Sequence, residues 1–228
     1  MKKVAIVMFV KTPYLSPCKT RLAKRLGQDK SLDFYKRSIQ VTLSVIQELT
    51  HEDICIDPYF AVAEEEGMNS SYWSAIDRVY QGIGGLGDRL AKVYEELITK
   101  YNGVLFLGSD CPHIKKDVLN NCLDHFSKGK TEYLLGKCSD GGFYVFGGSS
   151  RLHCETWTSV EYSRSTTADQ LIESLNKTGD VKKIEESFDI DTYKDLEQYE
   201  HIDQKELSNT QQEFITWVEQ VLLNKVQR

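Results

Sequence analysis

The chain has 228 residues, a mass of 26.1 kDa and a formal net charge of −6 at pH 7, with 40% hydrophobic and 27% charged residues. This is the composition of a globular protein with enough chain to bury a sizeable core, and the acidic balance argues against wholesale binding of nucleic acid. The N-terminal apolar run, residues 4–10, is too short to span a membrane. The six cysteines include no Cys-x-x-Cys pair, which favours reduced, buried thiols in a cytoplasmic protein over a zinc or redox site.

The first predicted strand spans residues 3–10 and leads into a basic loop. This loop carries Lys11, Lys19 and Arg21, and basic side chains with free backbone N–H groups at a strand-to-helix turn suit a phosphate. We therefore expect these three residues to bind phosphate groups, with a solvated basic face as the alternative. The loop is not a Walker A loop, since Cys18 stands where that motif has glycine, and it holds no glycine for a dinucleotide-binding fingerprint.

An amphipathic helix is predicted over residues 31–49, with Ser31 as its N-cap. Residues 54–62 resemble a second strand. We expect Pro58 to interrupt or shift this strand, because proline has no N–H group for a sheet ladder. Residues 79–80 form a brief third strand.

A glycine-rich loop follows Gln81 and places four glycines within the six residues from Gly82 to Gly87. Such a loop lets the backbone approach a ligand closely, although a simple connecting turn explains it nearly as well. The helix that follows is predicted to end at Asn102-Gly103. Its predicted core face consists of Leu86, Leu90, Val93, Tyr94 and Leu97.

The chain is organised around a predicted strand at residues 104–107, whose four consecutive apolar residues are typical of a strand buried on both faces of a parallel sheet. Asp110 follows where the strand should emerge, and Pro112 prevents the strand from continuing. Ligands bind outside the carboxyl ends of the strands in an open α/β sheet. Asp110 is therefore well placed to hold a divalent cation that in turn holds phosphates. The alternative is that Asp110 caps a helix that begins near Ile114.

The remaining predicted elements alternate between helices and strands. They are a helix over 114–126, strands at 132–137 and 143–147, a helix at 166–175, a strand at 181–184 and a helix at about 210–224. Residues 151–164 show no regular periodicity. This order predicts an α/β fold with a mostly parallel central sheet flanked by helices, and the Asp140-Gly-Gly turn between two strands predicts one antiparallel element.

Two further carboxylates, Asp189 and Asp191, lie in the segment Asp-Ile-Asp-Thr near the C-terminus. The segment superficially matches the motif of haloacid-dehalogenase phosphatases, but we reject that function because only 37 residues follow Asp191. Instead, Asp191 and Asp110 are candidates to share one Mg²⁺ or Mn²⁺ ion from two different strand ends. The alternative is that Asp191 or Thr192 caps the helix that follows.

Five motifs in a fixed order carry a family resemblance. They are Phe9-Val-Lys-x-Pro-x₅-Lys-Thr-Arg-Leu-Ala23, Gln81-Gly-x-Gly-x-Leu-Gly-x-Arg89, Leu107-Gly-Ser-Asp-x-Pro112, Asp140-Gly-Gly-Phe-Tyr144 and Asp189-Ile-Asp-Thr-x₂-Asp-Leu196. Together they resemble the radical-SAM/selenodomain-associated transferases, a bacterial group in the glycosyltransferase A (GT-A), or nucleotide-diphospho-sugar transferase, superfamily. Relatives of this group include molybdenum-cofactor guanylyltransferase and phospholactate guanylyltransferase. The resemblance runs from about Val4 to Leu196.

This resemblance implies a Rossmann-like GT-A fold, a nucleotide-bearing donor and a divalent metal, Mg²⁺ or Mn²⁺. We expect a single domain over residues 1–228, with a C-terminal packing helix at 209–226. Two departures from the family pattern stand out. Ser16-Pro17 replaces a position that is usually glycine and stiffens the loop, and Ser109-Asp110-Cys111 lacks the Asp-x-Asp of metal-dependent glycosyltransferases. The single Asp110 is more like the nucleotidyltransferase branch.

The resulting hypothesis is a metal-dependent transferase that uses a nucleotide donor. Nucleotidyl transfer from an NTP is favoured over glycosyl transfer from a nucleotide-sugar, and the small-molecule acceptor is unknown. The alternative is a nucleotide-binding sensor or partner protein without turnover.

Each candidate residue has an expected role in this hypothesis. Lys19 and Arg21 would bind the donor phosphates and stabilise the leaving group. Asp110 and Asp191 would hold the metal, while Gln81 and the glycine loop (Gly82, Gly84 and Gly87) would contact the base or ribose. Asp140 would act as general base on an acceptor hydroxyl or position it, and a purely structural turn is the alternative.

Overall fold

The structure is a computed structural model that describes residues 1–129 and 132–226, with side chains described as far as Val221. It contains a seven-stranded sheet with the strand order β3-β2-β1-β4-β6-β5-β7. The strands are β1 (Lys2–Val10), β2 (Ile54–Val62), β3 (Asp77–Tyr80), β4 (Gly103–Gly108), β5 (Tyr133–Cys138), β6 (Phe143–Gly148) and β7 (Val181–Ser187).

Every strand except β6 runs in the same direction. β1 pairs in parallel with both β2 and β4, β2 pairs in parallel with β3, and β5 pairs in parallel with β7. β6 lies between β4 and β5 and is antiparallel to both. This arrangement confirms the predicted α/β fold with a mostly parallel sheet and one antiparallel element. As a result, the carboxyl ends of β1, β4, β5 and β7 meet at one edge of the sheet.

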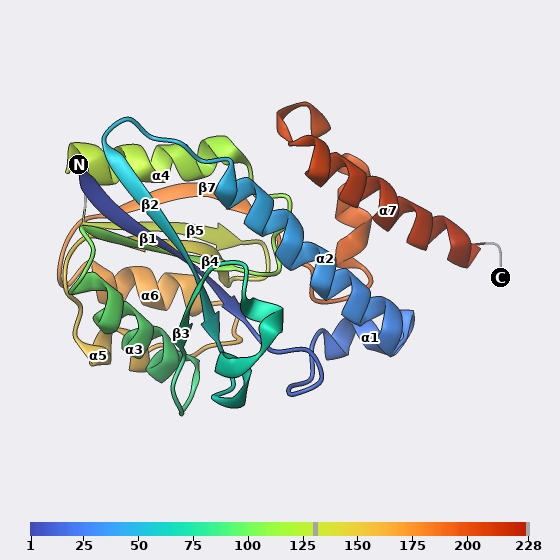
Figure 1. Cartoon of the computed structure of the whole chain (residues 1–228), viewed down its shortest axis with the longest axis horizontal. Helices are drawn as coiled ribbons and strands as arrows, with labels where there is room; N and C mark the ends of the chain where they lie inside the picture. The colour runs from blue at the N-terminus through green and yellow to red at the C-terminus, as the bar shows by residue number, and fades with distance from the viewer. Residues whose placement is uncertain (130–131, 227–228) are drawn as a thin grey trace.

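Helices cover both faces of the sheet (Figure 1). They are α1 (Thr20–Leu26), α2 (Gln28–Gln47), α3 (Leu86–Ile98), α4 (Lys116–Lys128), α5 (Cys154–Thr158), α6 (Thr167–Leu175) and α7 (Asn209–Val226). Short 3₁₀ helices lie at η1 (Glu66–Asn69), η2 (Ser71–Trp73), η3 (Asp195–His201) and η4 (Gln204–Glu206). Ile6 and Met8 of β1 face α2 and α4, whereas Ala5 and Val7 face α3, α5 and α6, and all four are fully buried. The uninterrupted apolar run of β1 is thus explained by burial on both faces.

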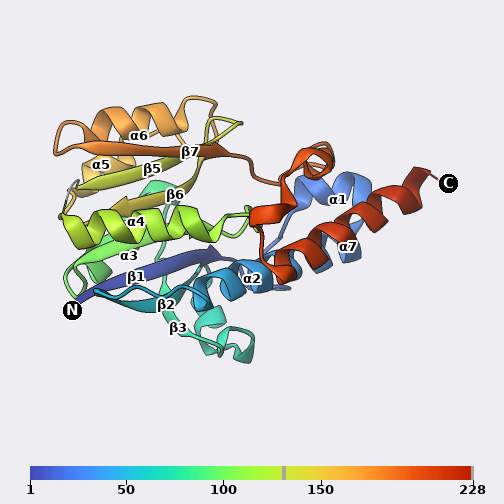
Figure 2. The same cartoon turned by 90° about the horizontal axis from the view of Figure 1, so that it is seen from above.

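A third apolar cluster lies beyond the carboxyl edge of the sheet, where α1 and α7 come together (Figure 2). Phe34 of α2 packs against Phe214 of α7, with ring centroids 5.5 Å apart. Tyr199 of η3 meets the same Phe214 ring at 6.1 Å. The C-terminal helix therefore packs on α2 and η3. None of the described helices is long and apolar enough to cross a membrane.

Two predicted details of the first half are wrong. Ser31 is not an N-cap: α2 already begins at Gln28, directly after Gly27, and Ser31 is buried inside the helix. Gly27 has φ +86°, a conformation that ends α1 and lets the chain restart a helix at once. Pro58 does not interrupt β2, because β3 pairs only from Tyr59 onward and Pro58 lies just outside that paired stretch.

The helix after the glycine-rich loop also differs from its prediction. Leu86 is the first residue of α3 and is 46% exposed, so it does not belong to the buried face of the helix. The helix ends at Ile98, and Asn102 accepts a hydrogen bond from the backbone N–H of Lys3 (2.8 Å). The region 151–164, which shows no periodicity, contains the short helix α5.

Candidate functional site

The site lies where the direction of chain winding reverses in the sheet. From β1 the chain proceeds through α2 to β2 on one side, and from β3 it returns through α3 to β4 on the other side of β1. Such a switch point leaves a crevice outside the carboxyl ends of the two neighbouring strands. Two adjoining cavities, of about 520 and 550 Å³, open there. They share Phe9, Arg21, Leu86, Gly108, Asp110 and Asp191.

The two cavities differ in charge. The basic cavity, of about 520 Å³, is lined by Lys11, Lys19, Arg21 and Arg89 in addition to the shared carboxylates. The acidic cavity, of about 550 Å³, is lined by Asp110, Asp140, Asp189 and Asp191, with Arg21 and Arg164 as its cations. Opposite charge thus gathers on the two sides of the strand end that carries Asp110.

Lys19 connects three segments of the site. Its ammonium group lies 2.8 Å from Oδ1 of Asp110 and 3.5 Å from Oδ1 of Asp191, and it donates to the carbonyl oxygen of Ile190 at 2.5 Å. Its side chain is 4% exposed, whereas those of Asp110 and Asp191 are 36% and 39% exposed. Lys19 precedes α1 with φ +49°, a left-handed conformation that is unusual for a residue with a side chain. The ammonium therefore bridges the two carboxylates that the sequence suggested for a metal.

Arg21 is far more accessible than Lys19. Its Nη1 lies 3.3 Å from Oδ2 of Asp191, but its side chain is 65% exposed. A guanidinium group can bind two phosphate oxygens at once, and most of this one is open to the cavities.

The site carboxylates do not act as helix caps. α4 begins at Lys116 with Lys115 as its N-cap, so Asp110 does not cap it. The carboxylate of Asp195 accepts hydrogen bonds from the backbone N–H groups of Asp191 (3.0 Å) and Thr192 (2.6 Å). This is the reverse of the capping alternative for Asp191 and Thr192, and it leaves the carboxylate of Asp191 directed at Lys19 and Arg21.

The basic loop is held in place by hydrogen bonds to three side chains beneath it in the fold. Tyr35 of α2 accepts a hydrogen bond from the backbone N–H of Lys11 (2.7 Å) and donates one to its carbonyl oxygen (2.9 Å). Thr12 accepts from the indole N–H of Trp73 (2.9 Å), and its own N–H donates to Glu64 (2.8 Å). The Lys11 side chain is exposed and lines the basic cavity. The loop is therefore fixed by buried groups and presents its cations outward.

Only some residues of the segment formed by Gln81 and the glycine-rich loop line the basic cavity. Gln81 is 4% exposed, and its side-chain amide donates to the carbonyl oxygens of Val10 (3.2 Å) and Ala61 (2.8 Å), so it holds strand ends together at the cavity floor. Gly84 lines the basic cavity, whereas Gly82 and Gly87 do not. A Cβ atom at Gly87 would lie 2.7 Å from the carbonyl oxygen of Trp157. Gly87 thus permits close packing of α3 on α5.

Asp140 lies in the turn between β5 and β6 and lines the acidic cavity. Its Oδ1 accepts a hydrogen bond from the backbone N–H of Gly142 (2.7 Å), which is a turn-stabilising contact. Gly141, with φ +91°, packs too closely on the backbone of Ser165 to leave room for a side chain. The turn therefore packs directly against the loop that precedes α6.

Sequence reasoning gave no role to Cys138 or Asp189. Burial, and to a smaller extent the nearby carboxylates Asp140, Asp191 and Asp110, raise the pKa of Asp189 to about 7. The Cys138 thiol and the carboxylates of Asp140 and Asp189 offer ligand atoms that all lie within 4.8 Å of one another. The sequence carried a signal for Cys138, which directly follows the predicted strand 132–137, whereas Asp189 lies five residues beyond the predicted strand 181–184.

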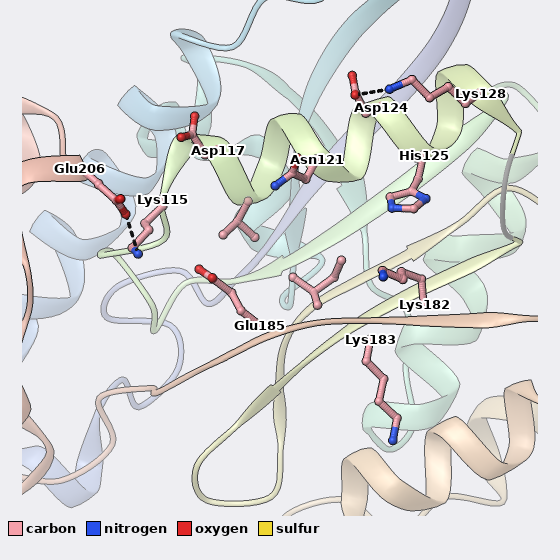
Figure 3. A pocket seen from close by; sticks show the side chains of 12 residues that line it. Lys115, Asp117, Asn121, Asp124, His125, Lys128, Lys182, Lys183, Glu185 and Glu206 are labelled. Carbon is pink, nitrogen blue, oxygen red and sulfur yellow. Dashed lines mark hydrogen bonds and ion pairs between the residues drawn. The ribbon is translucent and has the colours of Figure 1, made fainter.

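A further pocket, of about 330 Å³, lies between α4 and β7 (Figure 3). Among its lining residues four lysines face four acidic residues. Lys115 pairs with Glu206 at 2.7 Å, and Lys128 pairs with Asp124 at 2.5 Å. Because the charges are balanced and two of the four lysines are paired within the pocket, it offers less to an anionic ligand than the basic cavity does.

Comparison with protein families gives a match over residues 44–164 to the family described as "Uncharacterized protein conserved in bacteria (DUF2064)". The match covers more than half of the chain. The chain belongs to the DUF2064 family. The DUF2064 match includes the glycine-rich loop, Asp110 and Asp140, whereas Lys19, Arg21, Asp189 and Asp191 lie outside it. A comparison with curated proteins gave no match.

Solved structures share the fold of this DUF2064 chain. A "putative nucleotide-diphospho-sugar transferase" from Desulfovibrio desulfuricans G20 is 20% identical over 98% of each chain, with a TM-score of 0.83. A 4-diphosphocytidyl-2C-methyl-D-erythritol synthase from Anaerococcus prevotii DSM 20548 is 12% identical over 85% of this chain and 94% of its own, with a TM-score of 0.55. A cytidylyltransferase from Leptospira borgpetersenii is 14% identical over 99% and 96%, with a TM-score of 0.54. The likeness to a nucleotide-diphospho-sugar transferase agrees with the predicted fold.

Proposed function

We propose that this protein is a transferase that uses a nucleotide donor, and that it transfers a nucleotidyl group from an NTP to a small-molecule acceptor. The observation that carries the proposal is the meeting of a basic and an acidic cavity at Asp110, Asp191 and Arg21, on the switch point of the sheet. The fold relatives include cytidylyltransferases and a synthetase solved in complex with CTP, which supports a nucleotide as donor. The narrower resemblance, to radical-SAM/selenodomain-associated transferases with one GT-A-like domain over residues 1–228, is part of the same proposal.

The basic cavity would hold the donor. Lys11, Lys19 and Arg21 would bind its phosphates, and Lys19 and Arg21 would stabilise the negative charge that develops on departing pyrophosphate. Gly84 would let the backbone approach the base or ribose, with Gln81 holding the strand ends beneath it. Gly82 and Gly87 would contribute by setting the shape of this loop.

Asp110 and Asp191 are our proposed ligands for a divalent cation, Mg²⁺ or Mn²⁺. One ammonium group already reaches an oxygen of each carboxylate, at 2.8 and 3.5 Å, so both carboxylates face one common cation. Both carboxylates are more than one third exposed at the cavities, and carboxylate oxygens are the ligands that these ions prefer. When bound, the ion would neutralise charge on the donor phosphates. Lys19 would then turn from the carboxylates toward a phosphate.

The acidic cavity would hold the acceptor. Asp140 would act on an acceptor hydroxyl, as general base or by positioning it, while the acceptor oxygen attacks the α-phosphate and releases pyrophosphate. General-base catalysis of this kind typically contributes about 10²–10⁴ in rate. Oδ1 of Asp140 is engaged by Gly142, so Oδ2 is the oxygen that we assign to the acceptor.

The alternative candidate is a nucleotide sensor without turnover. It is favoured by the Ser16-Pro17 departure in the basic loop, and by Lys19 being already neutralised by Asp110 and Asp191. A sensor predicts that a nucleotide stabilises the protein, by ~2.7 kcal/mol at a hundredfold excess over Kd, without product.

Isothermal titration with CTP, GTP, UTP and UDP- or GDP-sugars, with and without Mg²⁺, tests the shared part of both candidates. Lack of binding of every nucleotide contradicts both of them. Release of pyrophosphate from an NTP in the presence of candidate acceptors supports transfer and excludes the sensor. Release of a nucleoside diphosphate from a nucleotide-sugar contradicts nucleotidyl transfer and supports glycosyl transfer.

A further inference from the structure

Three ligand-type side chains converge in the acidic cavity from different parts of the chain. Cys138 is the last residue of β5, Asp140 lies in the turn after it, and Asp189 follows the end of β7. Because β5 and β7 are parallel neighbours with Cys138 opposite Ser187, their ends bring the three residues together. The backbone N–H of Ser139 donates to the carbonyl oxygen of Ser187 (3.0 Å), which ties the two strand ends. The Sγ atom and one oxygen of each carboxylate lie within 4.8 Å of one another.

The thiol in this group is unusual. Cys138 is only 5% exposed, and no hydrogen bond of its Sγ is found among the residues that the structure describes. Its sulfur instead lies beside two carboxylates. A buried polar group without a partner costs free energy, and two neighbouring carboxylates add mutual repulsion.

Among the described residues, no cation pairs directly with either carboxylate. Over residues 1–129 and 132–221, neither Asp140 nor Asp189 forms an ion pair, whereas Asp110 and Asp191 pair with Lys19. Lys137, the lysine closest in sequence to the group, pairs with Asp169 instead. Arg21 and Arg164 also line the acidic cavity, but neither forms an ion pair with Asp140 or Asp189 in the described part of the chain, so these carboxylates lie beside the thiol without a directly bound positive charge.

We propose that Cys138, Asp140 and Asp189 bind a divalent cation at a site distinct from Asp110 and Asp191, and that this site prefers a thiophilic ion such as Zn²⁺ to Mg²⁺. One sulfur and two oxygen ligands suit the tetrahedral preference of Zn²⁺, with the fourth position open. Mg²⁺ demands octahedral coordination by oxygen and gains little from a thiolate. Binding releases the proton of the thiol, since only the thiolate is a good ligand.

The open fourth position of this site faces the acidic cavity, which Asp140 and Asp189 line. Under the proposed function, an acceptor hydroxyl would take this position, and Asp140 would then act on the acceptor as a ligand of the cation. This role in the reaction rests on the proposed function, but binding of the cation does not.

The test is titration of the metal-free full-length chain with Zn²⁺ against a chromophoric chelator, and with Co²⁺ followed by its thiolate charge-transfer absorbance. We expect Cys138→Ser to weaken Zn²⁺ binding at least about tenfold, since even substitutions behind the ligands cost 10–100-fold, and to abolish the charge-transfer band. Mg²⁺ affinity should change little. Cys154→Ser is the matched control, because Cys154 is an exposed thiol that belongs to no ligand group among the described residues.

A second variant guards against a folding defect. Asp189→Asn keeps the size of the side chain and should also weaken Zn²⁺ binding without lowering the melting temperature. The proposal is overturned if Cys138→Ser binds Zn²⁺ and Co²⁺ as the unsubstituted chain does, or if the only Zn²⁺ binding is lost in Cys154→Ser. Nucleotide titration of the same variants without metal distinguishes failure of the cation site from failure of the proposed function. Loss of the cation site alone leaves nucleotide binding by Lys19 and Arg21 unchanged.

Discussion

The backbone N–H of Ile190 donates a hydrogen bond to the carbonyl oxygen of Asp110, at 3.1 Å. The two residues follow β7 and β4, which are separated in the sheet by β6 and β5. The segment after β7 therefore crosses the sheet edge to reach Asp110, and the ammonium of Lys19 completes the junction by binding the carbonyl oxygen of Ile190. Three distant segments are held at one point, and this point is where the two cavities meet.

Substitution of Lys19 tests the donor side of this junction. Lys19→Met keeps most of the apolar stem but removes the ammonium, so we expect nucleotide affinity to fall at least about tenfold, equivalent to about 1.4 kcal/mol. Lys24→Ala, at an exposed position of the helix that follows Lys19, is the control and should bind nucleotide normally. Isothermal titration measures both. Unchanged affinity in Lys19→Met would remove Lys19 from the donor site.

Asp110→Asn and Asp140→Asn should have different effects, because Asp110 is proposed to bind the donor metal and Asp140 to act on the acceptor. The first variant is expected to weaken Mg²⁺-dependent nucleotide binding, because it removes a proposed ligand of the donor metal. The second keeps the turn, since asparagine tolerates the same backbone conformations, and should spare nucleotide binding while lowering turnover about 10²–10⁴-fold. Equal binding defects in both variants would place Asp140 with the donor metal, and full activity of Asp140→Asn would leave it only a turn role.

Asp189 should make stability depend on pH. Its pKa is raised to about 7 from an ordinary value of 3.8, mainly by burial. Between these values the unfolded chain has lost the proton that the folded chain still holds, so the free energy of unfolding falls as pH rises from 4 to 7 and levels off above 7. Asp189→Asn should lack this fall, and its stability advantage over the unsubstituted chain should grow across the same window. Urea unfolding in the presence of a metal chelator measures it.

The control for the pH dependence is Asp180→Asn, at an exposed position outside both cavities. Its stability curve should run parallel to that of the unsubstituted chain at every pH. If Asp189→Asn also runs parallel, the carboxyl of Asp189 ionises normally in the folded protein.

Gly87→Ala tests whether the last glycine of the loop is structural. A Cβ atom there would lie 2.7 Å from the backbone carbonyl of Trp157, so α3 and α5 must separate, and we expect a loss of about 1–3 kcal/mol in the free energy of unfolding. At Gly85 the nearest atom to a Cβ is 3.6 Å away, and Gly85→Ala should cost clearly less. Equal stability of the two variants would contradict the packing role of Gly87 and favour a role in ligand binding.

The sequence by itself determined the elements and the strand ends. The apolar run at residues 104–107 predicted a strand buried on both faces, and the structure buries β4 in this way. The ends of the strands that precede Lys19 and Asp110 were predicted from local residues that cannot continue a strand, above all proline. Such features are readable because side-chain periodicity and backbone restrictions act over a few neighbouring residues.

Only the tertiary structure decided which strand ends meet. β6 enters between β4 and β5, and β7 pairs beyond β5, so Cys138 and Asp189 converge although 50 residues separate them. It also decided that Lys19 bridges Asp110 and Asp191, that Leu86 is exposed, and that Gly87 packs against a helix. These outcomes depend on strand order, register and burial, which are set by contacts between distant segments and leave no mark on the local pattern.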